Sequence, residues 1–171
     1  MSLEGKRVVI VGDAVCSKTN LLTVLIKNQP EEENEFPILH DHSVSVPVNG
    51  KEVRLRLCDT SGQEDYPRLR PLSYARTDVI LLCFSIGSPA SLRNVLEKWT
   101  PEVNRFCPNI PIILVGNKKE LRNDPETIRK LSETNEEPVK FIEGLAMAQK
   151  ISAITYSMFN LILFQFKKFS N

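Results

Sequence analysis

The chain has 171 residues, of which 42% are hydrophobic and 25% charged, a composition typical of one globular domain over residues 1–171. Its formal net charge of +1 argues against a protein that binds nucleic acid along the phosphate backbone. The first residues hold no apolar signal-peptide core, and no apolar run approaches the length of a membrane span, so we expect a cytoplasmic protein.

The chain begins with the pattern of a strand, a loop and a helix. Residues 7–11 form an apolar run that ends at Gly12, and residues 18–27 place leucine and isoleucine at helical spacing. A strand, a loop that starts with glycine and a helix together form the opening of a βαβ unit. The acidic, turn-like residues 30–35 predict a loop after the helix.

Strands and helices alternate along the rest of the chain. Asn49 and Gly50 favour a hairpin between two strands. In chain order we expect strands over 43–48, 52–57, 77–85 and 110–115, a helix over 89–106, a short exposed helix within 123–138, a helix over 139–150 and a last strand within 151–158. This alternation predicts an α/β fold with a doubly wound, mostly parallel sheet and one antiparallel edge pair. Residues 159–166 are too apolar for the amphipathic helix expected there.

The four cysteines show no metal-binding pattern. They are Cys16, Cys58, Cys83 and Cys107. No two of them form a C-x-x-C pair, and their spacing matches no zinc site. We interpret them as small packing residues in a reducing compartment.

The loop after the first strand has the pattern of a phosphate-binding loop, G-x-x-x-x-G-K-[ST]. Its residues, all predicted to contact nucleotide, are Gly12, Asp13, Ala14, Val15, Cys16, Ser17, Lys18 and Thr19. Backbone N–H groups would hold phosphate, Lys18 would neutralise its oxygens, and the Thr19 hydroxyl would bind Mg²⁺. Ser17 replaces the second glycine and would cost about 1–3 kcal/mol if the loop demands glycine backbone angles. The alternative is a strand–turn–helix with an incidental lysine.

Two further motifs follow strands. Residues 59–63 read DTSGQ after the second hairpin strand, and residues 117–120 read NKKE after the strand at 110–115. Because the carboxyl ends of parallel strands lie at one edge of a sheet, the three motifs predict a single crevice.

These motifs resemble those of the small GTPases, and residues 59–103 and 106–124 resemble the Rho family in particular. The charged segment 124–138 stands where Rho proteins carry an extra insert helix. The resemblance covers about residues 5–152, whereas 153–171 do not match. It implies a P-loop small-GTPase (G-domain) fold with a Rho-type insert segment, GTP or GDP as ligand and Mg²⁺ as cofactor. It also implies exchange factors, activating proteins and effectors as partners.

The resemblance implies a role for each matched residue. Asp59 would hold Mg²⁺ through a water, Gly62 would sense the γ-phosphate, and Gln63 would orient the attacking water as the catalytic residue. Asn117 and Lys118 would contact and support the guanine ring. The alternative is that these are polar surface residues at strand ends.

The residues expected around the phosphates depart from the family pattern at two positions. Ala14 stands where the family has a glycine, and its methyl group would crowd the glutamine and any arginine finger, which predicts slow hydrolysis. The first switch lacks its threonine, since Pro37 or Ile38 occupies that position. The histidines His40 and His42 of this segment could suggest a metal site, but no third ligand accompanies them.

The base pocket departs as well. Pro30 replaces the aromatic residue that packs on guanine in the family. Glu120 replaces an aspartate, and the extra methylene would disturb bidentate binding of the guanine edge. The family's Ser-Ala-Lys loop is absent from residues 156–160, so we expect weak guanine specificity.

The last residues carry no lipidation signal. The chain ends Phe169-Ser170-Asn171 without a Cys-a-a-X box, and Lys167 and Lys168 are too few for a polybasic anchor. We therefore expect no lipid anchor. The mismatch after residue 152 is interpreted as a frame-shifted, intron-read or alternatively spliced end.

Three hypotheses remain from the sequence. The first is a Rho-type guanine-nucleotide-binding switch with impaired hydrolysis. The second is a pseudo-GTPase that binds Rho regulators or effectors through its second-switch surface, residues 64–74, without nucleotide turnover. The third is a non-functional product. Within that surface, Tyr66, Leu69, Arg70 and Leu72 could equally pack on the sheet.

Overall fold

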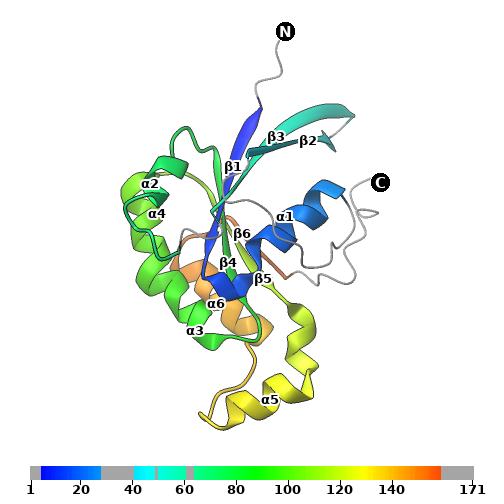
Figure 1. Cartoon of the computed structure of the whole chain (residues 1–171), viewed down its shortest axis with the longest axis vertical. Helices are drawn as coiled ribbons and strands as arrows, with labels where there is room; N and C mark the ends of the chain where they lie inside the picture. The colour runs from blue at the N-terminus through cyan, green and yellow to red at the C-terminus, as the bar shows by residue number, and fades with distance from the viewer. Residues whose placement is uncertain (1–4, 28–40, 49, 61–63, 159–171) are drawn as a thin grey trace.

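A computed structural model of the chain describes residues 5–27, 41–48, 50–60 and 64–158 (Figure 1). The strands are β1 (Lys6–Gly12), β2 (Asp41–Val48), β3 (Lys51–Asp59), β4 (Val79–Ser85), β5 (Ile112–Asn117) and β6 (Thr155–Met158). The helices are α1 (Lys18–Lys27), α2 (Arg70–Ser73), α3 (Pro89–Asn94), α4 (Thr100–Phe106), α5 (Pro125–Ser132) and α6 (Phe141–Lys150). Short helical turns are η1 (Ala14–Cys16), η2 (Val95–Trp99) and η3 (Lys119–Asn123).

The strands form one sheet in the order β2-β3-β1-β4-β5-β6. Strands β2 and β3 pair antiparallel at one edge, and every other pair is parallel. This confirms the predicted doubly wound, mostly parallel α/β sheet. The register brings Gly12 beside Cys83 and Ser85 beside Asn117. The carboxyl ends of these strands therefore lie at one edge of the sheet.

Hydrophobic cores cover both faces of the sheet, as the apolar strands require. On β1, Val9 and Val11 pack in a core with Trp99, whereas Val8 and Ile10 pack in the other core. Helix α1 supplies leucines to the second core, while α3, α4 and α6 cover the first face (Figure 1). Since successive side chains of a strand alternate between faces, one strand feeds both cores.

The predicted helix over 89–106 is divided by a π-helical turn. Helix α3 runs into η2, and α4 follows it. Pro101 has no backbone N–H, so it cannot complete the regular hydrogen-bond ladder with the preceding turn. The Thr100 hydroxyl instead donates to the carbonyl of Val95 at 2.6 Å. The hydrophobic period predicted one uninterrupted helix because it does not register the missing N–H of Pro101.

The segment proposed as an insert, residues 124–138, contains α5, and no residue of α5 is buried. Asp124 caps α5 by accepting the Thr127 N–H at 2.8 Å, which agrees with the predicted short exposed helix. The last strand is shorter than the range considered and begins at Thr155. The apolar stretch 159–166 lies outside the described residues.

All four cysteines are buried and none forms a disulfide, which confirms their interpretation as packing residues. In the described ranges no group of three or more His, Cys, Asp and Glu side chains could hold a metal ion. His40 lies outside those ranges. Among the helices of the described part, none combines the length and the apolar character needed to cross a membrane.

Candidate functional site

The loop between β1 and α1 needs glycine at its first position. Gly12 has φ 148°, and a Cβ there would collide with the carbonyl oxygen of Cys83 on the neighbouring strand β4. After Gly12 the chain forms the short turn η1 and enters α1 at Lys18. The tight approach of β1 to β4 therefore sets where the loop starts.

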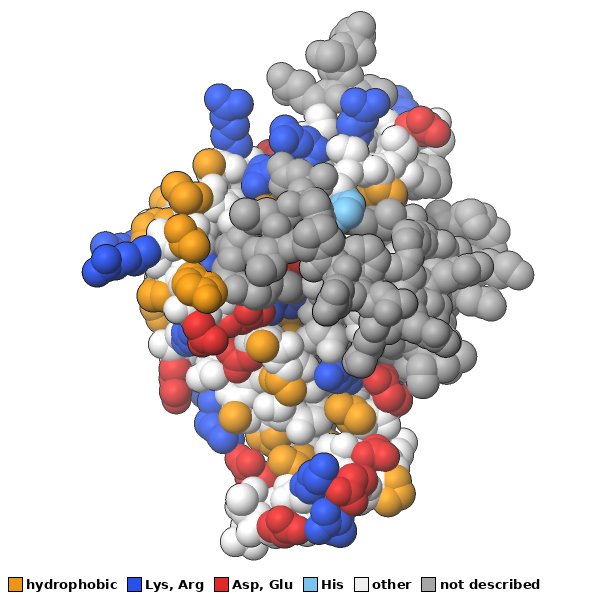
Figure 2. Space-filling model, in the orientation of Figure 1, with side chains coloured by type: hydrophobic (Ala, Val, Ile, Leu, Met, Phe, Trp, Pro, Cys, Tyr) orange, Lys and Arg blue, Asp and Glu red, His pale blue; other side chains and the backbone are white. Residues whose placement is uncertain are grey.

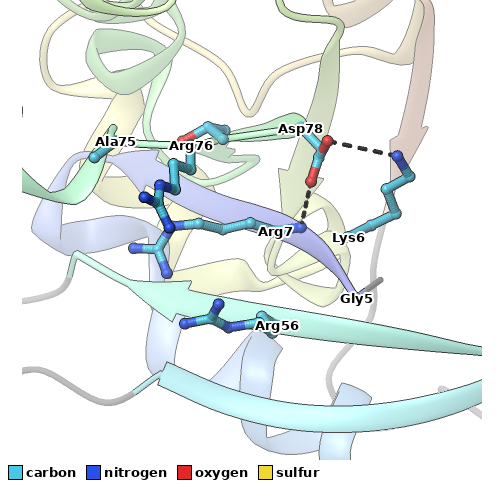
Figure 3. Close-up of a pocket in the computed structure, with 8 residues that line it drawn as sticks. Gly5, Lys6, Arg7, Arg56, Ala75, Arg76 and Asp78 are labelled. Atoms are coloured by element: carbon cyan, nitrogen blue, oxygen red, sulfur yellow. Dashed lines mark hydrogen bonds and ion pairs between the residues drawn. The ribbon is translucent and has the colours of Figure 1, made fainter. Parts of the chain in front are cut away.

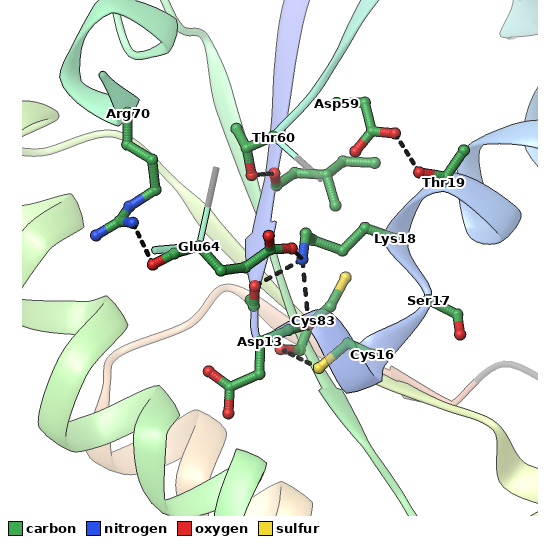
Figure 4. A network of polar contacts seen from close by, with 12 residues as sticks. Asp13, Cys16, Ser17, Lys18, Thr19, Asp59, Thr60, Glu64, Arg70 and Cys83 are labelled. Carbon is green, nitrogen blue, oxygen red and sulfur yellow. Dashed lines mark hydrogen bonds and ion pairs between the residues drawn. The ribbon is translucent and has the colours of Figure 1, made fainter. Parts of the chain in front are cut away.

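Ser17 lies in the left-handed region, with φ 52° and ψ 53°. A residue with a Cβ adopts this conformation at a cost of about 1–2 kcal/mol. The loop thus imposes the backbone angles for which glycine was expected. The Ser17 side chain points away from Lys18 (Figure 4), so the hydroxyl adds no contact to the ammonium.

The ammonium of Lys18 lies inside the loop, and its side chain is only 1% exposed. Nζ donates to the carbonyls of Gly12 at 2.7 Å and of Asp13 at 3.1 Å. It also donates to a carboxylate oxygen of Glu64 (Figure 4). Because an ammonium has three N–H donors, these contacts occupy all of them. A phosphate that used Lys18 would have to replace Glu64.

The two residues predicted to bind Mg²⁺ are in direct contact. The Thr19 hydroxyl donates to Oδ2 of Asp59 at 2.6 Å, which connects α1 to the end of β3. The next residue, Thr60, is buried and donates to the carbonyl of Ile10 at 2.6 Å. A hydroxyl and a carboxylate are the oxygen ligands that Mg²⁺ prefers, so this pair fits the ion chemically.

Asn117 links the end of β5 to the phosphate loop. Its side chain is fully buried and Nδ2 donates to the carbonyl of Cys16 at 2.7 Å. Its Oδ1 is buried, and so is Oε2 of Glu120, and neither has a hydrogen-bond partner in the described part of the chain. Between them Lys118 takes a left-handed conformation that turns the chain into η3. Buried acceptors without partners are costly, and the N–H groups of a guanine edge would satisfy them.

Asp13 directs its carboxylate away from Lys18 (Figure 4). The two oxygens accept from Asn94 Nδ2 and from Trp99 Nε1, each at 2.8 Å. In this geometry the Asp13 side chain fastens the loop to α3 and η2. Only its backbone belongs to the phosphate-facing part of the loop.

The remaining loop residues differ in exposure. Ala14 and Val15 are exposed, whereas Cys16 is buried and its thiol donates to the carbonyl of Cys83 at 3.3 Å. Burial raises the pKa of Cys16 to about 12. The thiol therefore stays protonated and acts as a packing group.

Glu64 is a site residue that the motif analysis missed. The available signal was a carboxylate directly after Gln63, in the loop that follows β3. Periodicity and motif spacing contain no information on which cation such a carboxylate meets. The prediction therefore required the folded arrangement of β3 beside β1.

The segment after Glu64 is anchored by a buried ion pair. Arg70 donates to both carboxylate oxygens of Glu102, at 2.8 and 2.7 Å, and to the backbone carbonyl of Glu64 at 2.6 Å. The Tyr74 hydroxyl donates to Glu102 at 2.6 Å. Burial raises the pKa of Glu102, but the bonds from Arg70 and Tyr74 outweigh it, so the pKa lies below its usual value. Glu102 therefore stays ionised at neutral pH.

Arg70 is buried beneath the second-switch surface, as are Ser73 and Tyr74, whereas three apolar side chains of this surface are exposed. The exposed fractions are 57% for Tyr66, 52% for Leu69 and 75% for Leu72. The sequence left open whether these residues bind a partner or pack on the sheet, and the answer differs from one residue to the next. Arg70 packs beneath the surface, and the three apolar side chains face outward.

Several predicted residues cannot be placed. Gly62 and Gln63 lie outside the described residues, as do Pro30, Pro37 and Ile38. Their roles remain predictions.

A comparison with known protein families adds an independent observation. The family described as the Ras family matches residues 7–159. The match begins in β1 and continues past residue 152, where the Rho-like resemblance ended.

Proposed function

The chain belongs to the Ras family of small GTPases, and from that premise we propose that it is a Rho-type guanine-nucleotide-binding switch in signalling, with impaired hydrolysis of GTP. The observation that carries this proposal is the buried Lys18 ammonium in the loop after β1, next to the Thr19–Asp59 pair. This combination of a cation, a hydroxyl and a carboxylate suits a nucleotide phosphate with its metal ion. The exposed helix α5, at the position of the Rho insert, supports the Rho subtype.

Each part of the site has a task in this proposal. The loop N–H groups and Lys18 would hold phosphate oxygens, while Thr19 and Asp59 would hold Mg²⁺. The ion would supply positive charge that offsets the charge of the phosphates. Asn117, Lys118 and Glu120 would position the base, and the two buried acceptors would receive its N–H groups.

Three features of the described residues weaken binding. Ser17 is held in a left-handed conformation, Lys18 is already paired with Glu64, and Glu120 replaces the shorter aspartate. Each change of about 1.4 kcal/mol lowers affinity tenfold. We therefore expect GDP binding that is weaker than a typical member of the family shows.

The first experiment measures whether nucleotide is bound. Purified protein is denatured and the nucleotide in the supernatant is identified by chromatography, and a titration with fluorescent GDP and Mg²⁺ follows. Stoichiometric guanine nucleotide, or saturable GDP binding, is the expected result. A folded protein that is empty and does not titrate would contradict the proposal.

Impaired hydrolysis has a separate test. Ala14 is exposed in the loop, at the position where its methyl group would crowd the attacking water. In a single-turnover assay, Ala14→Gly should hydrolyse GTP about tenfold faster than the unmodified chain. Ile142→Ala, at an exposed position of α6, serves as the control and should leave the rate unchanged. Equal rates for Ala14→Gly and the unmodified chain would show that Ala14 does not limit hydrolysis.

A second candidate function is a pseudo-GTPase that binds Rho regulators without nucleotide turnover. The observation in its favour is the exposure of Tyr66, Leu69 and Leu72 beside the anchored Arg70. Aromatic and aliphatic side chains on a fixed backbone are typical of binding hot spots. Such a surface would bind a partner without any ligand in the phosphate loop.

The second candidate is tested with a purified Rho-family exchange factor. Leu72→Ala should weaken its binding to the nucleotide-free chain by about tenfold or more, whereas Leu96→Ala should not. Leu96 is a suitable control because it is also exposed but lies on η2. No measurable binding of the unmodified chain would argue against this candidate.

A further inference from the structure

A second pocket lies at the other end of β1 from the phosphate loop. It has a volume of about 640 Å³ and is formed by the start of β1, the middle of β3 and the turn before β4. Its charged lining residues are Lys6, Arg7, Arg56, Arg76 and Asp78 (Figure 3). Figure 2 shows Lys and Arg side chains gathered at this end of the molecule.

Four cations face one carboxylate in this pocket, a net of three positive charges. Both oxygens of the carboxylate are already used. Asp78 Oδ2 accepts the backbone N–H of Arg7 at 2.8 Å, and Oδ1 lies 3.6 Å from Nζ of Lys6. Both carboxylate oxygens of Asp78 are therefore engaged by the first two residues of β1.

The arginines come from three separate segments. Arg7 and Arg56 are register partners on β1 and β3, where like charges repel. Arg7 also donates to the carbonyl of Ser73 at 3.3 Å, which ties its guanidinium to the end of α2. Their guanidinium groups and that of Arg76 point toward the same side of the pocket (Figure 3).

Arg76 has two features that suit a ligand contact. It is an exposed residue in a left-handed turn, with φ 55°, so the backbone conformation directs it over the pocket. Among the residues that the structure describes, no hydrogen bond or ion pair is found for its guanidinium. A planar guanidinium presents paired N–H donors that match phosphate oxygens.

We propose that this pocket binds a small anion that carries more than one phosphate group. A ligand with several phosphate oxygens would accept hydrogen bonds from Arg76 and, at the same time, from the guanidinium groups of Arg7 and Arg56 beside it. The volume is within the range of small-molecule sites, about 300–1,000 Å³. The ligand is a free phosphorylated compound or the headgroup of a phosphorylated lipid, which share this chemistry.

The test is calorimetric titration of the whole chain with inorganic pyrophosphate. Because the phosphate loop could also bind this probe, two variants are compared. Arg56→Gln/Arg76→Gln should weaken binding about tenfold or more, whereas Lys18→Ala should retain a pyrophosphate site of unchanged affinity. No binding by the unmodified chain would overturn the proposal. Loss in Lys18→Ala with no change in the double variant would overturn it as well.

Matched controls make the result specific to the pocket. Arg129→Gln/Lys150→Gln removes the same charge from exposed positions on α5 and α6 and should leave affinity unchanged. Thermal unfolding checks that each variant folds, and Arg76→Gln alone replaces the double variant if that one does not. If affinity falls as much in the control as in the double variant, the overall charge of the protein attracts the anion and the pocket is not a specific site.

A vesicle assay identifies the source of the anion. The chain is mixed with phosphatidylcholine vesicles with and without phosphatidylinositol bisphosphate, and sedimentation separates the bound fraction. Binding that requires the phosphorylated lipid and is lost in Arg56→Gln/Arg76→Gln supports the pocket with a headgroup as ligand. Pyrophosphate binding without vesicle binding supports the pocket with a free anion as ligand.

Discussion

The phosphate side and the base side of the proposed nucleotide site satisfy their polar groups in different ways. On the phosphate side, Lys18 is paired with Glu64, and Thr19 with Asp59. On the base side, Asn117 Oδ1 and Glu120 Oε2 are buried and have no hydrogen-bond partner within the described ranges. One side is complete with the chain's own residues, and the other offers acceptors that a ligand could satisfy.

This difference predicts where binding energy is lost. A phosphate that enters the loop replaces a Lys18–Glu64 ion pair, so only the difference between two anions contributes to affinity. A guanine edge that meets Asn117 and Glu120 removes the desolvation penalty of unpaired acceptors. Contacts on the base side should therefore add to the affinity for nucleotide. On the phosphate side, the competition between Glu64 and phosphate for Lys18 should limit that affinity. The following substitutions test this from the largest expected effect to the smallest.

Lys18→Ala should weaken GDP binding about 100-fold or more, because it removes the one buried cation of the loop. Fluorescent GDP titration measures the effect, and Lys119→Ala, at an exposed lysine of η3, is the control. If Lys18→Ala binds GDP as tightly as the control, the phosphate side contributes nothing and the comparison is wrong.

Glu64→Gln should strengthen GDP binding by about 10–20-fold, since a neutral amide competes with phosphate for Lys18 less well than a carboxylate does. The neighbouring Asp65 is exposed, so Asp65→Asn tests the general loss of a negative charge. An equal gain in both variants would assign the effect to long-range charge. No gain in either would show that Glu64 does not compete with the nucleotide.

Glu120→Asp sharpens the comparison on the base side. The shorter side chain should restore paired hydrogen bonds to the guanine edge and raise the preference for GDP over IDP about fivefold. IDP lacks the exocyclic amino group, so the ratio of the two dissociation constants isolates this contact. Glu97→Asp, at an exposed position of η2, should leave the ratio unchanged. An unchanged ratio in Glu120→Asp would mean that Glu120 does not read the base.

Ser17→Gly should raise the free energy of unfolding by about 0.5–1 kcal/mol. Relief of the left-handed conformation is worth about 1–2 kcal/mol, and the greater freedom of glycine in the unfolded chain offsets part of it. Denaturant unfolding measures the change. Ser132→Gly, at the last residue of α5, should be destabilising by about 0.5 kcal/mol instead. A loss of stability in Ser17→Gly would contradict the assigned strain.

Local patterns along the chain predicted most of the fold. The apolar runs and helical spacing located the strands and helices, and the helix over Lys18–Lys27 has the predicted bounds. The loop that begins at Gly12 was also predicted from the sequence, and so was the need for glycine-like backbone angles at Ser17, because backbone conformation depends on neighbouring residues. The π-helical turn η2 was missed since hydrophobic period does not register the missing N–H of Pro101.

Only the tertiary structure decided which polar groups meet. Lys18 lies against Glu64, Asp13 turns to Trp99, and Arg70 is buried on Glu102. Each pair joins segments that are distant in the chain or separated by a loop, so neither period nor motif spacing identifies the partners. The same holds for the pocket of Arg7, Arg56 and Arg76, which exists because β1, β3 and the turn before β4 come together. The sequence by itself determined the position of the loop that begins at Gly12 and the order of strands and helices, because short-range sterics and burial dictate them. The distances between charged side chains required the folded sheet.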